Sequence, residues 1–356
     1  MRERNAVDVL LVSLGSTEGL RRADDELQDS LIRAGASVAV ARPFPPAQTP
    51  TLMLTDLAWA HAARRATRKV IEQLRRSPAR AVIYSSTTAA LLWPRPGAIR
   101  FDATSAGNRP GRHGLWQRPL ERRRLRQAPL LLPWSEGGLR EAPPAARGGD
   151  RALVLPVPVE PSGPPESGAR ETVRDIAAIT YAANPSKKGL DRVLSAWRRL
   201  LADRRSVDHR SGASEELVVT GASQEALQRA GLLVPGEEGV RVVGALASEE
   251  YRALLRRARV FVCAPRREDY GIAQLEALAD GCLLVTTAAP GPYVALPIAR
   301  ELDPRLVGED LQGALRVALE DPVADYATRA REALVPFSRD VADRLVAEEL
   351  LPRLLA

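Results

Sequence analysis

Two glutamates, Glu268 and Glu276, are the residues whose type and spacing most clearly allow ligand chemistry. Seven residues separate them, and apolar runs flank them on both sides. The pattern predicts a buried strand over 260–262, a loop over 265–270 and a helix over 271–279. Glu268 falls in the loop and Glu276 in the helix. Two carboxylates so placed can accept hydrogen bonds from the hydroxyls of one polyol at two points, so the sequence predicts a ligand site at the end of a strand.

The start of this predicted helix adds hydrogen-bond donors to the same site. The backbone N–H groups of Gly271, Ile272 and Ala273 would lack intrahelical acceptors, and they lie at the positive end of the helix dipole. Such a helix start can hold a phosphate or a sugar hydroxyl. We therefore expect these three amides to face the same ligand as the two glutamates.

A second segment, residues 176–200, repeats the order of strand, short polar loop and amphipathic helix, with Lys187 and Lys188 at the turn into the helix. The chain has one other lysine, Lys69, and its remaining cations apart from histidine are arginines. A compact ammonium on a flexible stem suits a diphosphate as a point charge. We interpret Lys188 as a diphosphate ligand and assign Asn184, in the same loop, to the same site; the alternative is an exposed lysine of the first helical turn.

The segment EDYGIAQLEALADG, residues 268–281, resembles the E-x7-E signature of retaining glycosyltransferases, especially glycosyltransferase family 4, and the lysine turn resembles that family's "KGld" segment. In that family the first glutamate contacts the donor sugar and the second holds the ribose of the nucleotide, while the amides between them face the sugar and diphosphate. The resemblance implies these roles for Glu268, for Glu276 and for residues 271–273. It implies a hexosyltransferase-type enzyme that moves a sugar from a nucleoside-diphosphate sugar to an unidentified acceptor, with retention of anomeric configuration.

One departure from the family concerns the phosphate-binding cations. Many members carry an arginine about five residues before the lysine, and here residues 182–185 read AANP. Either Arg266 or Arg267 supplies the second cation from the neighbouring loop, or the donor phosphates are held with less neutralisation. The sequence leaves these alternatives open.

The first half of the chain alternates apolar runs with helical stretches, which indicates βαβ order. Its predicted strands are 8–13, 38–41, 81–84, 98–101, 130–133 and 153–155, and its predicted helices are 21–34 and 52–75. In the second half we predict further strands at 217–220 and 240–243.

At 356 residues the chain suits two domains, and the proline-rich stretch 156–168 predicts their boundary. We expect a Rossmann-like acceptor domain over 1–160 and a Rossmann-like donor domain over 169–337. A final helix, about 340–351, is expected to lead residues 338–356 back onto the first domain. The expected fold class is α/β with GT-B architecture, in which two doubly wound domains face each other across a cleft.

The predicted acceptor domain contributes weaker candidates. Gly15 lies in the loop LGSTEGL after the first strand, where the family brings backbone close to the donor phosphates. His113 lies in a glycine-flanked loop, where an imidazole could hydrogen-bond the sugar or move a proton. Members of the family often have a histidine in this domain near the donor sugar; a structural or phosphate-binding role is the alternative. Asp102 is a second candidate beside it.

The net charge is +7, and seven arginines fall between Arg109 and Arg126. This basic stretch can attract anionic lipid headgroups or an anionic acceptor, or it can be a solvated helix face. The expected partners are the nucleotide-sugar donor and an acceptor that is a glycan, a lipid or a small molecule. The alternatives are a basic nucleic-acid-binding protein and a non-catalytic nucleotide-sugar-binding protein of the same fold; a content of 4% aromatic residues disfavours the nucleic-acid reading.

No apolar run approaches the roughly 20 residues needed to span a bilayer. We therefore expect a cytoplasmic protein with a peripheral contact at the inner face of the membrane as one option. Cys263 and Cys282 lack metal-type spacing and are interpreted as small buried hydrophobic residues. No metal cluster or Asp-x-Asp motif is visible in the candidate loops, so we expect a metal-independent reaction with no cofactor besides the donor substrate.

Overall fold

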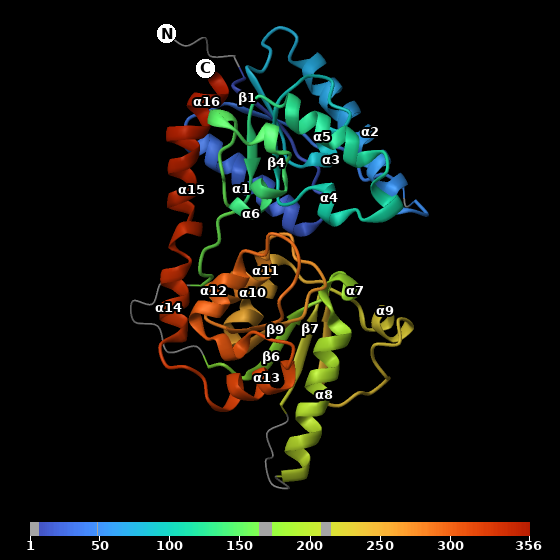
Figure 1. The fold of residues 1–356 in the computed structure, drawn as a ribbon, viewed down its shortest axis with the longest axis vertical. Helices are drawn as coiled ribbons and strands as arrows, with labels where there is room; N and C mark the ends of the chain where they lie inside the picture. Colours follow the sequence, from blue (N-terminus) through green and yellow to red (C-terminus); the bar gives the residue numbers. More distant parts are fainter. Residues whose placement is uncertain (1–6, 48, 164–172, 208–214) are drawn as a thin grey trace. The chain divides into compact units, whose positions relative to one another are not determined.

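The computed structural model describes residues 7–47, 49–163, 173–207 and 215–356. The chain forms two compact units (Figure 1): residues 1–158 with 337–356, and residues 159–336. Residues 164–172, which include the end of the proline-rich stretch and the start of the predicted donor domain, lie outside the described residues. None of the helices in the described ranges is long and apolar enough to cross a membrane.

The first unit alternates strands and helices along the chain. Its elements are β1 Val9–Val12, α1 Glu18–Arg33, β2 Val38–Ala41, α2 Leu52–Gln73, β3 Ala81–Tyr84, α3 Thr87–Ala90, β4 Ala98–Phe101, α4 Ser105–Asn108, α5 Gln117–Gln127, β5 Leu131–Pro133 and α6 Glu136–Glu141. The strands form one parallel sheet in the order β2-β1-β3-β4-β5.

Both faces of this sheet are buried, which explains the nearly continuous apolar runs of its strands. Leu10 and Val12 of β1 belong to one hydrophobic cluster, whereas Val9 and Leu11 belong to another. This division follows the two-residue period of a strand, which sends successive side chains to opposite faces.

The C-terminal segment packs on the second of these clusters. It consists of α15 Arg339–Leu345, a π-helical turn Val346–Leu350 and α16 Leu351–Leu355. Val346 and Leu350 are fully buried among residues of β1, β3 and α1, and α15 lies beside α1 (Figure 1). Arg33 of α1 donates Nε to Asp343 of α15 at 2.7 Å. The segment therefore completes the first unit, although it follows the second in sequence.

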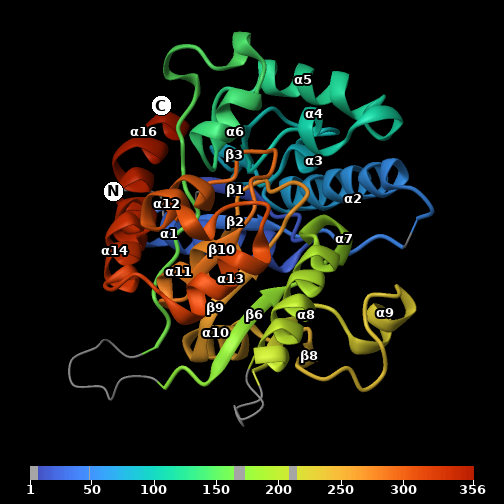
Figure 2. The ribbon, with the colours of Figure 1, turned by 60° about the horizontal axis from the view of Figure 1, so that its bottom comes forward.

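The second unit also alternates strands and helices along the chain. Its elements are β6 Ile176–Tyr181, α7 Pro185–Lys188, α8 Leu190–Val207, β7 Leu217–Thr220, α9 Gln224–Arg229, β8 Val240–Gly244, α10 Ser248–Arg257, β9 Ala258–Cys263, α11 Ile272–Ala279, β10 Leu283–Thr286, α12 Ala295–Leu302, α13 Leu311–Glu320 and α14 Tyr326–Ala333. Its parallel sheet has the order β10-β9-β6-β7-β8. Helices α8 and α13 pack side by side over this sheet (Figure 2). Helix α10 contacts β6, β9 and α11.

Three sequence predictions need correction. Residues 153–155 do not form a strand: Leu153 and Leu155 donate single hydrogen bonds to Leu131 and Pro133, but only an isolated bridge forms beside β5. The helix predicted over 21–34 starts at Glu18, because the Thr17 side chain caps it by accepting from the amide of Leu20.

The third correction concerns the last helical segment, which runs beyond the predicted end near residue 351. Pro352 lacks an amide proton and would break a helix if it lay in the helix interior. The π-helical turn shifts the hydrogen-bond register so that Pro352 lies in the first turn of α16, where its missing N–H costs nothing.

Candidate functional site

The two predicted motifs lie at the point in the second sheet where the strand order reverses. β6 and β9 are neighbours in this sheet. The strands that follow β6 in sequence, β7 and β8, lie on one side of this pair, whereas β10, which follows β9, lies on the other side. The loops that leave these two strands, residues 182–184 and 264–271, therefore start at the same edge of the sheet. In open parallel sheets such a switch point is the usual place for a ligand.

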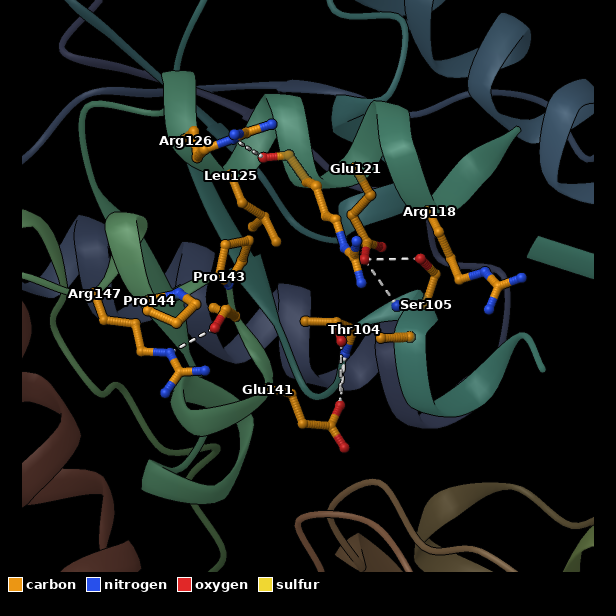
Figure 3. Close-up of a pocket in the computed structure, with 13 residues that line it drawn as sticks. Thr104, Ser105, Arg118, Glu121, Leu125, Arg126, Glu141, Pro143, Pro144 and Arg147 are labelled. Carbon is orange, nitrogen blue, oxygen red and sulfur yellow. Dashed lines mark hydrogen bonds between the residues drawn. The ribbon is translucent and has the colours of Figure 1, made fainter. Parts of the chain in front are cut away.

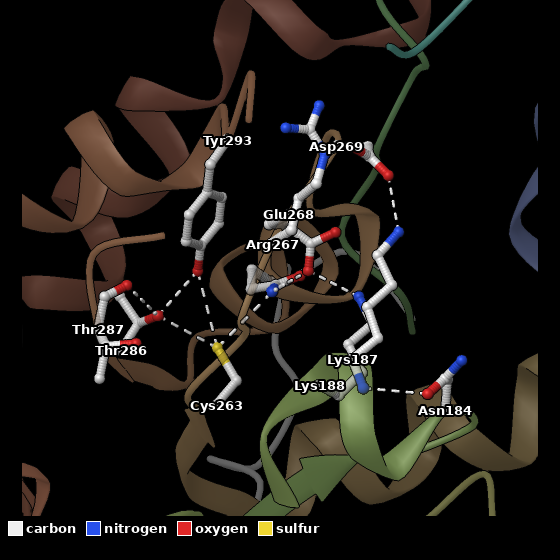
Figure 4. Close-up of polar contacts among 11 residues, drawn as sticks. Asn184, Lys187, Lys188, Cys263, Arg267, Glu268, Asp269, Thr286, Thr287 and Tyr293 are labelled. Atoms are coloured by element: carbon white, nitrogen blue, oxygen red, sulfur yellow. Dashed lines mark hydrogen bonds and ion pairs between the residues drawn. The ribbon is translucent and has the colours of Figure 1, made fainter. Parts of the chain in front are cut away.

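Two ion pairs join these loops directly (Figure 4). The Nζ atom of Lys188 lies 2.6 Å from Oε2 of Glu268, and the Nζ atom of Lys187 lies 2.6 Å from Oδ2 of Asp269. The side chains of Lys188 and Glu268 are 20% and 6% exposed, so this pair is largely shielded from water. The structure thus places the two main candidates from separate motifs in contact with each other.

Asp269 is shared by two cations. Besides Lys187, it accepts a hydrogen bond from Nε of Arg267 at 2.7 Å. Burial alone would raise the pKa of Asp269, but Lys187 and Arg267 lower it below its usual value. Three cations and two carboxylates, 3 − 2 = 1, leave this cluster with one net positive charge.

Arg266 forms hydrogen bonds between the two loops. Its guanidinium donates to both carboxylate oxygens of Asp191, at 2.9 and 2.7 Å, and to the carbonyl of Ser186 at 2.8 Å. Its backbone amide donates to the carbonyl of Lys187 at 2.9 Å. Arg266 therefore fastens one loop to the other, which separates its role from that of Arg267.

Close backbone approach fixes the lysine turn. Gly189 has φ +65°, and a Cβ at this position would lie 1.9 Å from the carbonyl oxygen of Ala264. Only glycine fits there, because both the left-handed backbone and the contact exclude a side chain. Asn184 caps the short helix α7: its Oδ1 accepts from the amide of Lys187 at 3.0 Å. Asn184 is exposed next to the lysines, so its observed contact is structural.

The start of α11 supplies the predicted amides, with one change of register. The helix begins at Ile272, and Gly271 is its N-cap with φ +100°. This positive φ favours glycine, and a Cβ on Gly271 would also lie only 3.1 Å from the ring of Tyr293. Ile272 and Ala273 are partly exposed in the first turn, where amides lack intrahelical acceptors.

A buried polar network holds the side chain of Glu268 in place. The sequence analysis did not identify this network. Gln274 donates Nε2 to Oε2 of Glu268 at 3.0 Å and lies 3.6 Å from the sulfur of Cys263. Cys263 in turn contacts the hydroxyls of Thr286 and Tyr293 (Figure 4). Gln274 is a polar residue within an apolar helix and could have been noticed; the other partners come from distant elements without any local signal.

Glu276 is buried beside an arginine that the sequence did not reveal. Nη1 of Arg252 in α10 lies 3.7 Å from Oε1 of Glu276, and the same guanidinium binds both oxygens of Asp280 at 2.6 and 2.8 Å. Burial would lower the pKa of Arg252, but Asp280 and Glu276 raise it. Asp280 follows Glu276 by four residues, which puts both carboxylates on one helix face. That spacing was the available signal for this network.

The candidates of the first unit lie at its own sheet edge. Gly15 has φ +55° in the loop after β1, and the neighbouring Leu14 amide donates to Oγ of Ser85 after β3 at 3.2 Å. His113 is exposed in a short 3-10 turn, Gly111–Gly114, and its imidazole makes no hydrogen bond to any residue that the structure describes. Asp102 accepts from the amide of Ala103 at 2.7 Å. No group of three His, Cys, Asp or Glu residues in the described chain is placed to hold a metal.

Comparisons with known proteins agree with this architecture. Residues 175–324 match the family model described as glycosyl transferases group 1. Among solved structures, the glycosyltransferase WaaG of lipopolysaccharide biosynthesis is 16% identical with a TM-score of 0.63, and the match covers 98% of this chain and 99% of that one. No curated protein sequence matches the chain.

Two further structures are similar over the whole chain. Anabaena HepE in complex with UDP and glucose is 14% identical with a TM-score of 0.64 and coverages of 97% and 99%. The UDP-forming trehalose-phosphate synthase of Burkholderia xenovorans in complex with glucose-6-phosphate is 15% identical with a TM-score of 0.62 and coverages of 99% and 100%. The chain therefore has the predicted GT-B fold, and its residues 175–324 are similar to the glycosyl transferases group 1 family.

Proposed function

We propose that this glycosyltransferase takes its sugar from a nucleoside diphosphate sugar bound at the switch point of the second sheet. The observation that carries the proposal is the contact between Lys188 and Glu268, which brings a cation and a hydroxyl acceptor to one point beside the start of α11. In the proposed complex Lys188 binds the diphosphate, Glu268 orients the sugar and Glu276 holds the ribose.

The chemistry suits these groups. When the sugar leaves its donor, negative charge develops on the diphosphate, and the protein must offset that charge rather than supply a strong nucleophile. Lys188 and the first amides of α11 provide positive potential for it. We assign the second cation to Arg267, because it shares Asp269 with Lys187, whereas the guanidinium of Arg266 is bound to Asp191 and Ser186.

The similar structures favour a particular donor and outcome. HepE was solved with UDP and glucose, and a trehalose-6-phosphate synthase of E. coli with UDP-2-fluoro glucose. Another trehalose-6-phosphate synthase structure, similar with a TM-score of 0.63, concerns glycosyl transfer with retention. We propose a UDP-sugar donor and retention for this chain as well.

The first unit is assigned to the acceptor, with Gly15 and His113 as its proposed contributions to the reaction. The proposed reaction needs no metal and no cofactor besides the donor substrate. A peripheral contact of the basic segment 109–126 with an anionic membrane is a prediction for an acceptor that is a lipid.

The test combines binding and turnover. Thermal-shift measurements with UDP-, GDP- and ADP-sugars are run on the parent, on Lys188→Ala and Glu276→Ala, and on Lys69→Ala as a matched control in the first unit. A UDP-sugar should stabilise the parent and the control but not the two site variants. Equal stabilisation of all four proteins would place the site elsewhere. Nucleotide-sugar binding without release of UDP, with a panel of acceptors present, would instead indicate a non-catalytic binding protein.

A further inference from the structure

A separate cavity of about 360 Å³ lies within the first unit (Figure 3). One wall is the loop that leaves β4, with Thr104 and Ser105, and another is one face of α5. The third wall is the segment from Glu141 to Arg147, which follows β5 and α6. The cavity is therefore at the carboxyl edge of the sheet, the edge where parallel α/β sheets bind ligands. The roles proposed above for Gly15 and His113 do not use it.

Four arginines line this cavity. Arg118, Arg122 and Arg126 are spaced four residues apart, so they lie along one face of α5, and Arg147 comes from the third wall. We call these four residues the arginine pocket. Such a set of like charges repels itself, and a bound anion would relieve this repulsion, although water already screens it at Arg122 and Arg126, whose side chains are exposed.

The two carboxylates that line the cavity accept hydrogen bonds from backbone amides instead of pairing with these arginines. Oε1 of Glu121 accepts from the amide and the hydroxyl of Ser105, each at 2.8 Å, and Oε2 of Glu141 accepts from the amide of Thr104 at 3.0 Å (Figure 3). Burial raises the pKa of Glu121. Across the described ranges, none of the four arginines forms an ion pair with a carboxylate.

Arg118 already donates Nε to the carbonyl of Gly114 at 3.2 Å and Nη2 to that of Gly111 at 2.7 Å, whereas the other three guanidinium groups keep more donors for a ligand. Nε of Arg126 donates to the carbonyl of Arg122 at 3.3 Å, and Nε of Arg147 donates to the carbonyl of Ala142. The Nη groups of both residues, and the whole guanidinium of Arg122, have no hydrogen-bond partner in the part of the chain that the structure describes. Leu125 and two prolines give the cavity an apolar side.

We propose that the arginine pocket binds a phosphate monoester carried on a small polyol. A guanidinium matches phosphate oxygens with two parallel hydrogen bonds, and a dianion balances the excess of two cations over the two carboxylates, 4 − 2 = 2. The volume of about 360 Å³ suits a ligand of this size. The further assignment of this ligand as the sugar acceptor rests on the proposed function, whereas its binding does not.

Isothermal titration with glycerol 3-phosphate, at constant ionic strength, tests the proposal. Replacing two guanidinium groups in Arg122→Gln/Arg126→Gln should weaken binding at least about ten-fold, because it removes charge-assisted hydrogen bonds. The control Arg123→Gln removes a neighbouring charge of α5 that does not line the cavity, and it should bind like the parent. Equal loss in the control would mean a general charge effect, and no binding to the parent at about 20 mM would overturn the proposal at once.

Lys188→Met separates this inference from the proposed function. The variant should keep its affinity for glycerol 3-phosphate and lose affinity for UDP. If it loses affinity for glycerol 3-phosphate as well, the phosphate binds in the second unit and the arginine pocket is not the site. If UDP binds every variant equally while glycerol 3-phosphate responds as expected, only the donor assignment fails.

Discussion

The ion pair between Lys188 and Glu268 allows a quantitative test of the site geometry before any ligand is known. Lys188→Met removes the ammonium and leaves the carboxylate of Glu268, which is 6% exposed, with Gln274 as its remaining hydrogen-bond donor. A hydrogen bond to a charged group contributes about 1.5–3 kcal/mol, and breaking a fully buried pair costs about 3–5 kcal/mol. Because Lys188 is 20% exposed and water can reach it, we expect a loss near the lower value, about 2 kcal/mol.

The double-mutant cycle isolates the pair itself. In Glu268→Gln the free ammonium of Lys188 can turn toward water, so we expect a loss of about 1 kcal/mol. The combined variant Lys188→Met/Glu268→Gln leaves no unpaired charge and should be about 1–2 kcal/mol more stable than the sum of the single losses predicts. For a unit of this size, 1 kcal/mol corresponds to a shift of about 2–4 °C in Tm.

The measurement is urea unfolding combined with scanning calorimetry on the parent and the three variants. The pair Arg257 and Asp175 is the matched control, because both of its side chains are 47% exposed and its coupling should stay below about 1 kcal/mol. If the losses at Lys188 and Glu268 add within about 0.5 kcal/mol, the two side chains do not interact in solution. The site built on their contact would then be wrong.

Two further predictions concern residues that affect the stability of each unit. Gly189→Ala should destabilise the protein by more than about 3 kcal/mol, because its Cβ would meet the carbonyl oxygen of Ala264, whereas Gly236→Ala, with a similar φ of +71° and open space around it, should cost only about 1 kcal/mol in chemical unfolding. Equal losses would show that the close approach is absent. In the first unit, burial raises the pKa of Asp24 to about 6, so the folded state holds this proton more tightly and the resulting stability, present below about pH 4, is lost as the pH rises to about 6. The stability of Asp24→Asn relative to the parent should therefore rise by about 2–3 kcal/mol between pH 4 and pH 7, and a pH-independent difference would contradict this.

The sequence predicted the sheet strands well wherever burial on both faces produced an apolar run. The strands at 38–41, 81–84, 98–101 and 217–220 have the predicted limits. Those at 81–84 and 217–220 are fully buried, as expected for interior strands of a parallel sheet, whereas 38–41 is a half-buried edge strand and 98–101 contains the buried Arg100. Residues 153–155 have the same apolar character but pair only through an isolated bridge. Strand pairing is a property of the neighbours, so the local pattern could not distinguish this case.

The candidate site was predictable to the extent that each part of it is local in sequence. The lysine turn and the acidic segment each follow a strand, so their side chains could be identified one by one. Their mutual contacts depend on the adjacency of β6 and β9, which is a matter of strand order. The partnership of Arg252 with Glu276 and Asp280 also joins separate elements. The four-residue spacing of the two carboxylates marks their common helix face, but it does not identify the arginine of α10 that pairs with them.

The pairing of Lys188 with Glu268 has a consequence for how a donor would bind. Each of these groups already satisfies the other, so a diphosphate that draws Lys188 away must leave Glu268 with a new partner. A donor sugar can supply that partner through a hydroxyl, whereas a free nucleoside diphosphate cannot. The exchange of one ion pair for two ligand contacts would therefore favour the intact nucleotide sugar over the spent nucleotide, since only the former compensates both buried groups. The ion pair is then part of the selectivity of the site, and Glu268→Gln should reduce the difference between the affinities for UDP and for a UDP-sugar.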